Sequence, residues 1–367
     1  MSELMKVGLA GFGEVAQMHL QAYRECPGLA VVSVADNEAA KLDRARSEFG
    51  IPGYRSLTEM LRAHALDIVC VLTPPASHEA LICEAADAGV HVLCEKPMSL
   101  TVAACERMIA ACQSRGVRLC YGSSYRYLPA LMTARNMIAE GCIGDVLVLR
   151  EYAVGGIAAA RRGTLSFAHY PKGGPGGSGM GLCDHGIHLI DVFPWLMDSV
   201  ITGVSGRGNI SGEPQRPEYA NFEYANGAIG QLLYEDGTFT TALPTEGAFA
   251  WGGGWNVGGA TAAPSGSWNA DPGCIHVHGS KGSLRVYHYA NRLFHRSESG
   301  VREVRVPDRP MPGHFGMQLE AFIAAIRTGA PTPVPGEVGL DAVRTLLAIY
   351  EGERSPPARA ADTAPMQ

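Results

Sequence analysis

The chain has 367 residues, of which 46% are apolar and 18% are charged, a composition typical of a soluble globular protein with room for two domains. Its formal net charge of -6 provides no basic surface, so we expect neither nucleic acid nor a membrane surface as a partner. The ten cysteines occur without a Cys-x-x-Cys pair, and no apolar run near the amino terminus is long enough for a signal peptide, so we expect a cytoplasmic protein.

The first predicted element is a short buried strand, Met5 to Ala10, which a glycine turn and a helix follow. The turn reads Gly11-Phe12-Gly13-Glu14-Val15-Ala16, with Ala16 in the third glycine position of a dinucleotide-binding fingerprint. Gly11 permits a tight turn, and Gly13 lets the backbone approach a pyrophosphate. The helix amino terminus offers unpaired N–H groups to the phosphates. Alone, this motif is equally compatible with an ordinary turn.

A second buried-strand pattern, Leu29 to Ala35, ends at Asp36. A carboxylate at this position can accept hydrogen bonds from both hydroxyls of an adenosine ribose, and it repels a 2′-phosphate. No arginine follows Asp36, so we expect NAD rather than NADP as the cofactor. Asp36 can also cap the helix predicted for Asn37 to Phe49, and the two roles are compatible.

Strands and helices then alternate strictly, which predicts a parallel sheet with crossover helices. The predicted strands are Asp67 to Leu72, Val90 to Cys94 and Val117 to Gly122, and the helices are Ser77 to Ala88 and Leu100 to Arg115. Open sheets of this kind bind ligands at their carboxyl edge. Two segments reach that edge: the proline-stiffened loop Thr73 to His78, and Leu93 to Pro97, which presents Lys96.

Asp184 and His188 are four residues apart in a segment predicted to be helical, which places them on one face about one turn apart. The glycine-rich run Lys172 to Leu182 precedes them and would let a ligand approach the backbone. A carboxylate beside an imidazole favours the imidazolium form and can orient the ring. In isolation, such a pair is more often found on a protein surface than in a site.

Three motifs in this order resemble the Gfo/Idh/MocA oxidoreductases, a family that includes glucose–fructose oxidoreductase and inositol dehydrogenase. They are Gly11 to Ala16, Thr73 to His78 and Glu95-Lys96-Pro97, and the resemblance continues through Tyr125 to Pro129, Gly141 to Val146 and Asp184 to Asp191. The implied fold class is α/β, with an N-terminal Rossmann dinucleotide-binding domain (1–123) and a C-terminal α/β domain (124–355) that has a large, mostly antiparallel open sheet. We expect residues 356–367 to form a disordered tail. Because that sheet often packs against a partner subunit in family members, we expect a homodimer or homotetramer.

The resemblance also implies a catalytic constellation of Lys96, Asp184 and His188, acting on a secondary alcohol of a sugar, glycoside or cyclitol. Lys96 would hydrogen-bond the reacting oxygen and stabilise the negative charge that develops there. It would also disfavour protonation of His188, which could then take the hydroxyl proton as a base. Sequence leaves open whether Lys96 or His188 takes this proton, and we favour His188.

Tyr125 and His185 are further candidate contacts to the substrate. We expect no metal ion, because neither the group Asp184, His185 and His188 nor the pair His276 and His278 has a closed ligand pattern. Alternation along a strand puts His276 and His278 on the same face.

We expect the cofactor to contact the carboxyl edge of the first sheet and the start of the second domain. The candidate residues are Gly11, Phe12, Gly13, Glu14, Val15, Asp36, Thr73, Pro74, His78, Glu95, Lys96 and Arg126. Glu95 is either a positioning residue at the nicotinamide ribose or a structural one. A cis peptide bond before Pro97 would fix the direction of the Lys96 side chain. Ser124 departs from the family, in which many members carry asparagine.

The remaining strands predicted for the large sheet are Asp145 to Val154, Ala220 to Tyr224, Ala228 to Glu235, Gly273 to His278 and Ser283 to Tyr289. His314 to Arg327 and Gly339 to Tyr350 are predicted helices. Gly155 to Pro171 has no counterpart in the family, and we expect it to shape specificity. The tryptophans Trp251, Trp255 and Trp268 could stack on a sugar ring or pack against a partner subunit.

Two other functions are compatible with the sequence. Some family members use bound NAD as a transient oxidant to cleave a glycosidic bond by elimination, with no net redox change. A dinucleotide-sensing regulator would keep the fold and lack the chemistry, but the presence of Lys96, Asp184 and His188 together argues against it.

Overall fold

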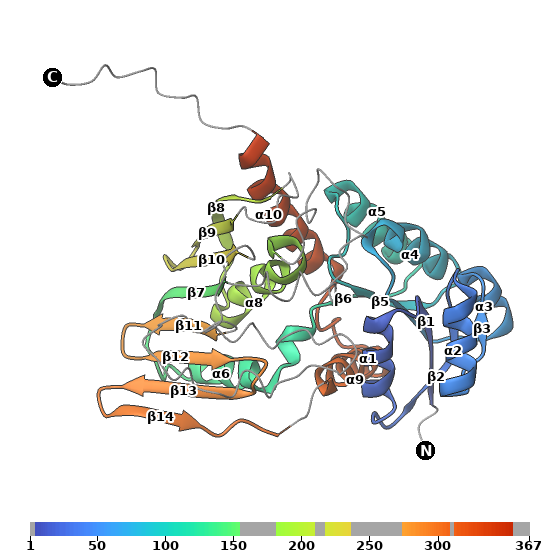
Figure 1. Cartoon of the computed structure of the whole chain (residues 1–367), viewed down its shortest axis with the longest axis horizontal. Helices are drawn as coiled ribbons and strands as arrows, with labels where there is room; N and C mark the ends of the chain where they lie inside the picture. Colours follow the sequence, from blue (N-terminus) through green and yellow to red (C-terminus); the bar gives the residue numbers. More distant parts are fainter. Residues whose placement is uncertain (1–3, 155–180, 210–216, 236–273, 309–311, 355–367) are drawn as a thin grey trace.

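The computed structural model describes residues 4–154, 181–209, 217–235, 274–308 and 312–354. Within these ranges, two sheets lie beside each other, and each carries its own helices (Figure 1). Several expectations concern residues outside the described ranges: those on 155–171, on most of the glycine-rich run, on 240–271 with its three tryptophans, and on the tail 356–367. None of the described helices combines the length and the apolar character that a membrane span requires.

The first sheet has six parallel strands in the order β3-β2-β1-β4-β5-β6, which confirms the predicted Rossmann arrangement. The strands are β1 Met5–Ala10, β2 Leu29–Ala35, β3 Gly53–Tyr54, β4 Ile68–Val71, β5 His91–Glu95 and β6 Leu119–Gly122. Every residue of β4 is buried, as expected for a parallel sheet that is covered on both faces. The sequence analysis missed β3, which has only two residues.

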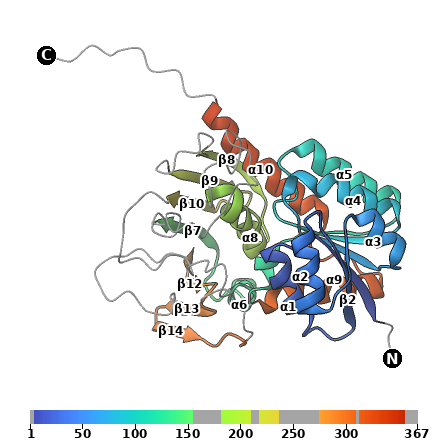
Figure 2. The ribbon, with the colours of Figure 1, turned by 45° about the vertical axis from the view of Figure 1, so that its right-hand side comes forward.

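Helices cover both faces of this sheet (Figure 2). They are α1 Glu14–Tyr23, α2 Ala39–Phe49, α3 Leu57–Ala63, α4 His78–Asp87 and α5 Val102–Ser114. Helix α4 packs against α5, whereas α1 packs against α9, Gly313–Thr328, which comes from the far end of the chain. The first domain is therefore completed by a C-terminal helix.

The second sheet has eight strands in the order β14-β13-β12-β11-β7-β10-β9-β8. They are β7 Val146–Val154, β8 Ile201–Arg207, β9 Glu218–Tyr224, β10 Ile229–Glu235, β11 Cys274–Gly279, β12 Ser283–Tyr287, β13 Arg292–Ser297 and β14 Gly300–Val304. Among the described strands, β7 and β10 are the one parallel pair, so the sheet is mostly antiparallel, as the family resemblance implied. Strands β8, β13 and β14 were not predicted, and β14 is largely exposed at the sheet edge.

The two sheets are joined by short helices and by the C-terminal segment. The connecting elements are η2 Ser124–Tyr127, α6 Pro129–Ala139, the π-helical turn η3 Gly181–Gly186, α8 Ile187–Met197 and α10 Gly336–Arg354. The N–H of Tyr121 in β6 donates to Val334 O at 2.8 Å, and Gln318 Nε2 donates to Tyr121 O at 3.0 Å. Residues near the end of the chain therefore satisfy the outer edge of β6.

Candidate active site

The glycine turn between β1 and α1 combines one sterically constrained glycine with one open glycine. Gly11 has φ +96°, and a Cβ there would lie 2.9 Å from Thr73 Cγ2 and 3.0 Å from the backbone of Leu72. A Cβ on Gly13 would meet nothing within 4 Å. Gly11 is thus required by the fold itself, whereas Gly13 leaves room beside the amino terminus of α1, where a pyrophosphate would fit.

Asp36 connects this turn to the second strand. Its Oδ2 accepts the Phe12 N–H at 2.9 Å, and its Oδ1 accepts the Glu38 N–H at 2.9 Å, just before α2 begins. Lys41 Nζ lies 3.7 Å from Oδ2. This lysine was not predicted as part of the site, and its charge would partly offset any repulsion of a 2′-phosphate by Asp36.

His78 lies behind the loop that follows β4. It is fully buried, and its ring nitrogens contact two main-chain carbonyls: Nε2 lies 2.7 Å from Thr73 O, and Nδ1 lies 3.1 Å from Met98 O. Burial lowers the pKa of the imidazole. A neutral imidazole donates from only one of these nitrogens, so His78 bonds to one of the two carbonyls, and Nδ1 also lies 3.4 Å from Cys94 Sγ.

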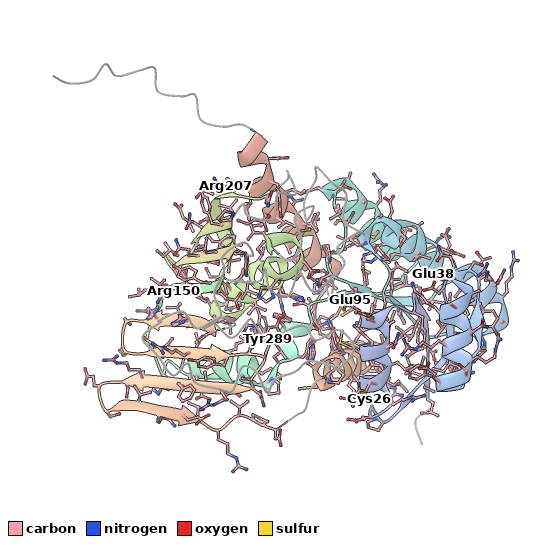
Figure 3. All side chains as sticks on the ribbon, viewed as in Figure 1. Cys26, Glu38, Glu95, Arg150, Arg207 and Tyr289 are labelled. Carbon is pink, nitrogen blue, oxygen red and sulfur yellow. The ribbon has the colours of Figure 1, made fainter. Side chains whose placement is uncertain are left out.

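Glu95 points away from the substrate side, toward α1. His19 Nε2 donates to Glu95 Oε1 at 3.0 Å, and the other oxygen, Oε2, accepts the Lys96 N–H at 2.9 Å. The His19 ring stacks on Phe315 of α9 at 4.0 Å. Glu95 is buried where the first domain faces the second, as Figure 3 shows, and its contacts support the structural role that the sequence left open.

Lys96 reaches from the end of β5 to the second domain, and its peptide bond to Pro97 is cis, as the sequence analysis anticipated. Its Nζ donates to Asp184 Oδ1 at 2.8 Å and to Asp184 O at 3.0 Å. Burial opposes the charge on Lys96, but Asp184 outweighs burial, so the pKa of the ammonium group is raised. Lys96 therefore remains a cationic donor at neutral pH.

His188 is oriented by an aromatic ring and not by Asp184. Its imidazole lies parallel to the Tyr125 ring, with centroids 3.7 Å apart and planes 3° apart. Burial and then Lys96 lower the pKa of His188 well below its usual 6.5. Its ring nitrogens form no hydrogen bond within the described part of the chain. The result is a neutral imidazole that can accept a proton.

The sequence predicted that Asp184 and His188 lie one turn apart on a single α-helix, and the structure differs. Asp184 lies in the π-helical turn η3, whereas His188 lies in α8. The wider turn brings Asp184 to Lys96, and it leaves His188 on Tyr125. π-Helical turns often mark functional sites, and sequence periodicity does not indicate them.

Arg126 forms a bidentate ion pair with Asp191 of α8, which is almost completely buried. Ser123 also donates to Asp191, and the Arg126 guanidinium lies 5.7 Å from the Trp195 ring centroid. The sequence analysis assigned no role to Asp191. Its position three residues after His188 on a helix with a strongly apolar composition was the available signal.

His185 faces the interior of the second domain. Its Nε2 lies 3.0 Å from Glu151 Oε2, and its Nδ1 lies 3.4 Å from the hydroxyls of Tyr125 and Tyr289. Burial would raise the pKa of Glu151, but His185 first and then His288 lower it to about 2. The expected substrate contact of His185 would thus have to compete with this buried network.

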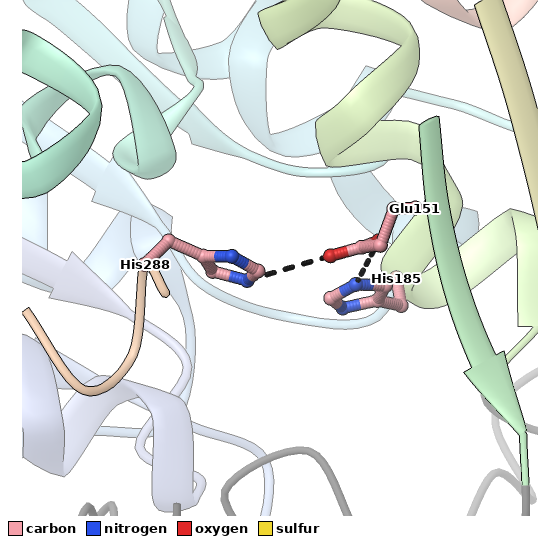
Figure 4. Close-up of side chains that lie close together, drawn as sticks. All are labelled: Glu151, His185 and His288. Atoms are coloured by element: carbon pink, nitrogen blue, oxygen red, sulfur yellow. Dashed lines mark hydrogen bonds and ion pairs between the residues drawn. The ribbon is translucent and has the colours of Figure 1, made fainter. Parts of the chain in front are cut away.

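Glu151 and His288 were not singled out from the sequence, although both lie beside His185 (Figure 4). Glu151 has the same orientation in β7 as the buried Leu149, so a carboxylate on the apolar face was the available signal. The pair His276 and His278 does lie on one face, with ring centroids 6.1 Å apart, as alternation predicted.

Two profiles of one oxidoreductase family match most of the chain. The profile of its NAD-binding Rossmann fold covers residues 5–123, and the profile of its C-terminal alpha/beta domain covers residues 135–355. The chain belongs to the Gfo/Idh/MocA family. This membership confirms the resemblance carried by Glu95-Lys96-Pro97 and the other motifs.

Named relatives within the Gfo/Idh/MocA family include sugar and cyclitol dehydrogenases. D-apiose dehydrogenase of Paraburkholderia graminis is 37% identical over 140 residues, which are 38% of this chain and 37% of that protein. Inositol 2-dehydrogenase 4 of Saccharopolyspora erythraea is 28% identical over 237 residues, which are 61% of this chain and 65% of that protein. The chain thus matches from about a third to about two thirds of the length of these relatives.

Solved structures share the fold over nearly the whole chain. An oxidoreductase from Agrobacterium radiobacter superposes with a TM-score of 0.76 at 20% identity, covering 96% of this chain and 97% of that one. Aldose-aldose oxidoreductase from Caulobacter crescentus gives 0.75 at 22% identity, covering 96% and 98%. At these identities the likeness establishes the two-domain architecture alone.

Proposed function

We propose that the chain is an NAD-dependent oxidoreductase that transfers a hydride between a secondary hydroxyl of a sugar, glycoside or cyclitol and the nicotinamide. The observation that carries this proposal is the placement of Lys96 and His188 at the boundary of the two domains: Asp184 holds the Lys96 ammonium at 2.8 Å, and burial and Lys96 lower the pKa of His188. Relatives named apiose, inositol and glucoside dehydrogenases support the substrate class.

The residues of the glycine turn fit a dinucleotide. Gly13 offers open space beside the start of α1, and Asp36 is positioned at the end of β2, where an adenosine ribose would be bound. NAD, when bound, would accept the hydride. We favour NAD over NADP because the Asp36 carboxylate would repel a 2′-phosphate. The ammonium group of Lys41, beside that carboxylate, would weaken this repulsion and so reduce the preference for NAD.

Lys96 and His188 act on the alcohol group of the substrate, each in a different role. Lys96 donates a hydrogen bond to the alcohol oxygen and stabilises negative charge as the proton leaves. His188 accepts this proton, because its imidazole is neutral at the pH at which Lys96 is charged. Asp184 keeps the ammonium group in place through two contacts.

A substrate screen tests the proposal. Purified protein is incubated with NAD or NADP and a panel of aldoses, glycosides and inositols, and NADH absorbance and product masses are recorded. NADH formed together with a keto product supports a dehydrogenase. A cleaved glycoside without net NADH would instead establish the transient-oxidation mechanism, and cofactor binding without turnover would favour a regulator.

Assembly through the second sheet is part of the proposal. Tyr219 of β9 and Ile229 of β10 project from the face opposite the buried Ala220 and Leu232, and they are 40% and 53% exposed. Apolar side chains on an open sheet face favour an interface between copies. Light scattering should give the mass of a dimer or tetramer, and Ile229→Glu should lower it. The matched control is Leu4→Glu, at an exposed apolar position just before β1 in the first domain, which should not change the mass.

A further inference from the structure

Three buried side chains of the kinds that bind metal ions lie close together beside His188. Glu151 comes from β7, His185 from the turn η3, and His288 from the residue that follows the end of β12 (Figure 4). One ligand atom from each lies within 4.8 Å of the other two. His185 Nε2 is 3.0 Å from Glu151 Oε2, and His288 Nε2 is 3.8 Å from Glu151 Oε1.

These separations suit a shared ion. Ligand atoms about 2.1 Å from a metal ion lie roughly 3.0 to 3.4 Å from one another in octahedral or tetrahedral coordination. The shorter observed separation falls in this range, and the longer one exceeds it by a few tenths of an ångström. The two distances reach different oxygens of Glu151, so an ion between the imidazoles could be bound by either oxygen or by both.

The carboxylate supplies a second, independent indication of a ligand. Oε2 of Glu151 accepts a hydrogen bond from the Tyr234 hydroxyl at 2.9 Å and also contacts His185 Nε2. Oε1 is completely buried and has no hydrogen bond to any described residue. A buried carboxylate oxygen without a hydrogen bond is costly, and His288 Nε2, 3.8 Å away, is too far to donate one, so Oε1 is available to a ligand.

The groups around the cluster match the usual support of a metal site. A metal-bound histidine generally uses its second ring nitrogen in a hydrogen bond that sets the ring orientation. His185 Nδ1 faces the hydroxyls of Tyr125 and Tyr289, which are hydrogen-bonded to each other. Tyr234 orients the Glu151 carboxylate in the same way.

We propose that Glu151, His185 and His288 bind one divalent transition-metal ion. Two imidazoles and one carboxylate suit ions such as Zn²⁺, Co²⁺, Mn²⁺ or Fe²⁺ better than Mg²⁺ or Ca²⁺, which prefer oxygen ligands throughout. The proposal replaces the sequence-based expectation of no metal, which considered His185 only with Asp184 and His188. It is independent of the proposed dehydrogenase activity.

The ion would act through position and not as a reactant. Tyr125 contacts His185 through its hydroxyl and carries the His188 ring on its face. An ion that holds His185 would therefore limit the movement of the Tyr125 hydroxyl, whereas the Tyr125 ring supports His188 by stacking.

Cobalt binding tests the site. The purified full-length chain is stripped with a chelator, titrated with Co²⁺, and passed over a desalting column; retained metal is counted by mass spectrometry and its visible spectrum is recorded. We expect one equivalent of Co²⁺ with absorption bands of a nitrogen- and oxygen-ligated ion. Glu151→Gln and His288→Gln should each weaken binding by at least about 100-fold.

His278→Ala is the matched control, because it removes an imidazole from the other face of the sheet and should leave the stoichiometry at one. The native chain decides the question even if a ligand variant fails to fold. X-ray absorption of the loaded native protein should show two imidazoles on the metal. Retention of no Co²⁺ by the native chain would overturn the proposal and leave an imidazole–carboxylate pair. Equal binding by the folded ligand variants would do the same.

Discussion

Lys96 Nζ donates to both the side chain and the main chain of Asp184, at 2.8 Å and 3.0 Å. The two residues belong to different sheets, so this contact joins the end of β5 to the turn η3. Each side chain is less than one-fifth exposed, and the pair is therefore poorly screened by solvent. A substrate hydroxyl that binds here meets an ammonium group whose charge and direction are already set.

Replacing Lys96 by methionine should reduce kcat by about 100- to 1,000-fold, because a donor to the developing alkoxide is lost. NAD affinity should change little, since the Lys96 ammonium is directed at Asp184. Turnover and cofactor titration by fluorescence would separate the two effects. Lys281→Met, at an exposed position, is the control and should behave as the native chain does. Full activity of Lys96→Met would exclude Lys96 from the chemistry.

The acidic limb of the pH profile should reflect His188. Its pKa is lowered from 6.5 by burial and by Lys96, with further contributions from His185, His314 and His288. The base therefore stays neutral, and kcat/KM in the alcohol-oxidising direction should stay constant, until the pH falls below the ordinary range of histidine. His188→Asn should lower kcat/KM by about 100- to 10,000-fold and abolish this limb. A limb centred at or above 6.5 would contradict the assignment.

Two substitutions at Tyr125 separate its ring from its hydroxyl. Tyr125→Phe keeps the face that stacks on His188, so we expect kcat within a few-fold of native. Tyr125→Leu removes the stacking, which is worth about 1 kcal/mol, and kcat should fall about 10-fold. Steady-state kinetics of both variants give the comparison. Equal losses in both variants would mean that the hydroxyl contacts, and not the stacking, position His188.

Cofactor choice should depend on the charge at Asp36. Asp36→Asn retains an oxygen for the Phe12 N–H but removes the carboxylate that repels a 2′-phosphate. We expect the ratio of kcat/KM for NAD over NADP to fall by about 10-fold, equivalent to about 1.4 kcal/mol. Lys41→Gln should shift the ratio the other way, toward NAD, because a cation close to Asp36 is removed. An unchanged ratio in both variants would locate the discrimination elsewhere.

Acid should destabilise the fold through buried histidines, and His314 is the clearest case. Burial, with a contribution from His19, lowers its pKa from 6.5 to about 3. The unfolded chain thus binds a proton that the folded chain excludes. The contribution of His314 to the free energy of unfolding is fully present above pH 6.5. It falls by about 1.4 kcal/mol per pH unit as the pH drops toward 3. The free energy of unfolding, measured with urea between about pH 7 and 5, should change less steeply with pH in His314→Gln than in the native chain.

The elements that the sequence predicted are those whose signal is local. Strict alternation defined the parallel sheet, and the placement of Lys96 at its carboxyl edge followed from the strand before it. Strand β14 escaped prediction because it is exposed at the sheet edge, and β13 because it buries only Leu293 and His295, so no buried run marks either strand.

The contacts that the sequence did not predict join residues that are distant in the chain. Glu95 meets His19 across 76 positions, and Glu151 meets His185 across 34. No spacing rule connects such residues, because only the packed sheets bring them together. The domain boundary near residue 123 and the assembly state stay predictions.

Completion of the dinucleotide-binding half depends on residues that are synthesised after all the described strands of the second sheet. The outer edge of β6 is paired by Val334 and Pro335, and α1 is covered by α9. Until those residues emerge, a nascent chain presents an open strand edge and an uncovered apolar helix face, both of which invite pairing with other chains. A chain that ends before α9 should therefore aggregate, and we expect the first half of this sequence not to fold stably by itself.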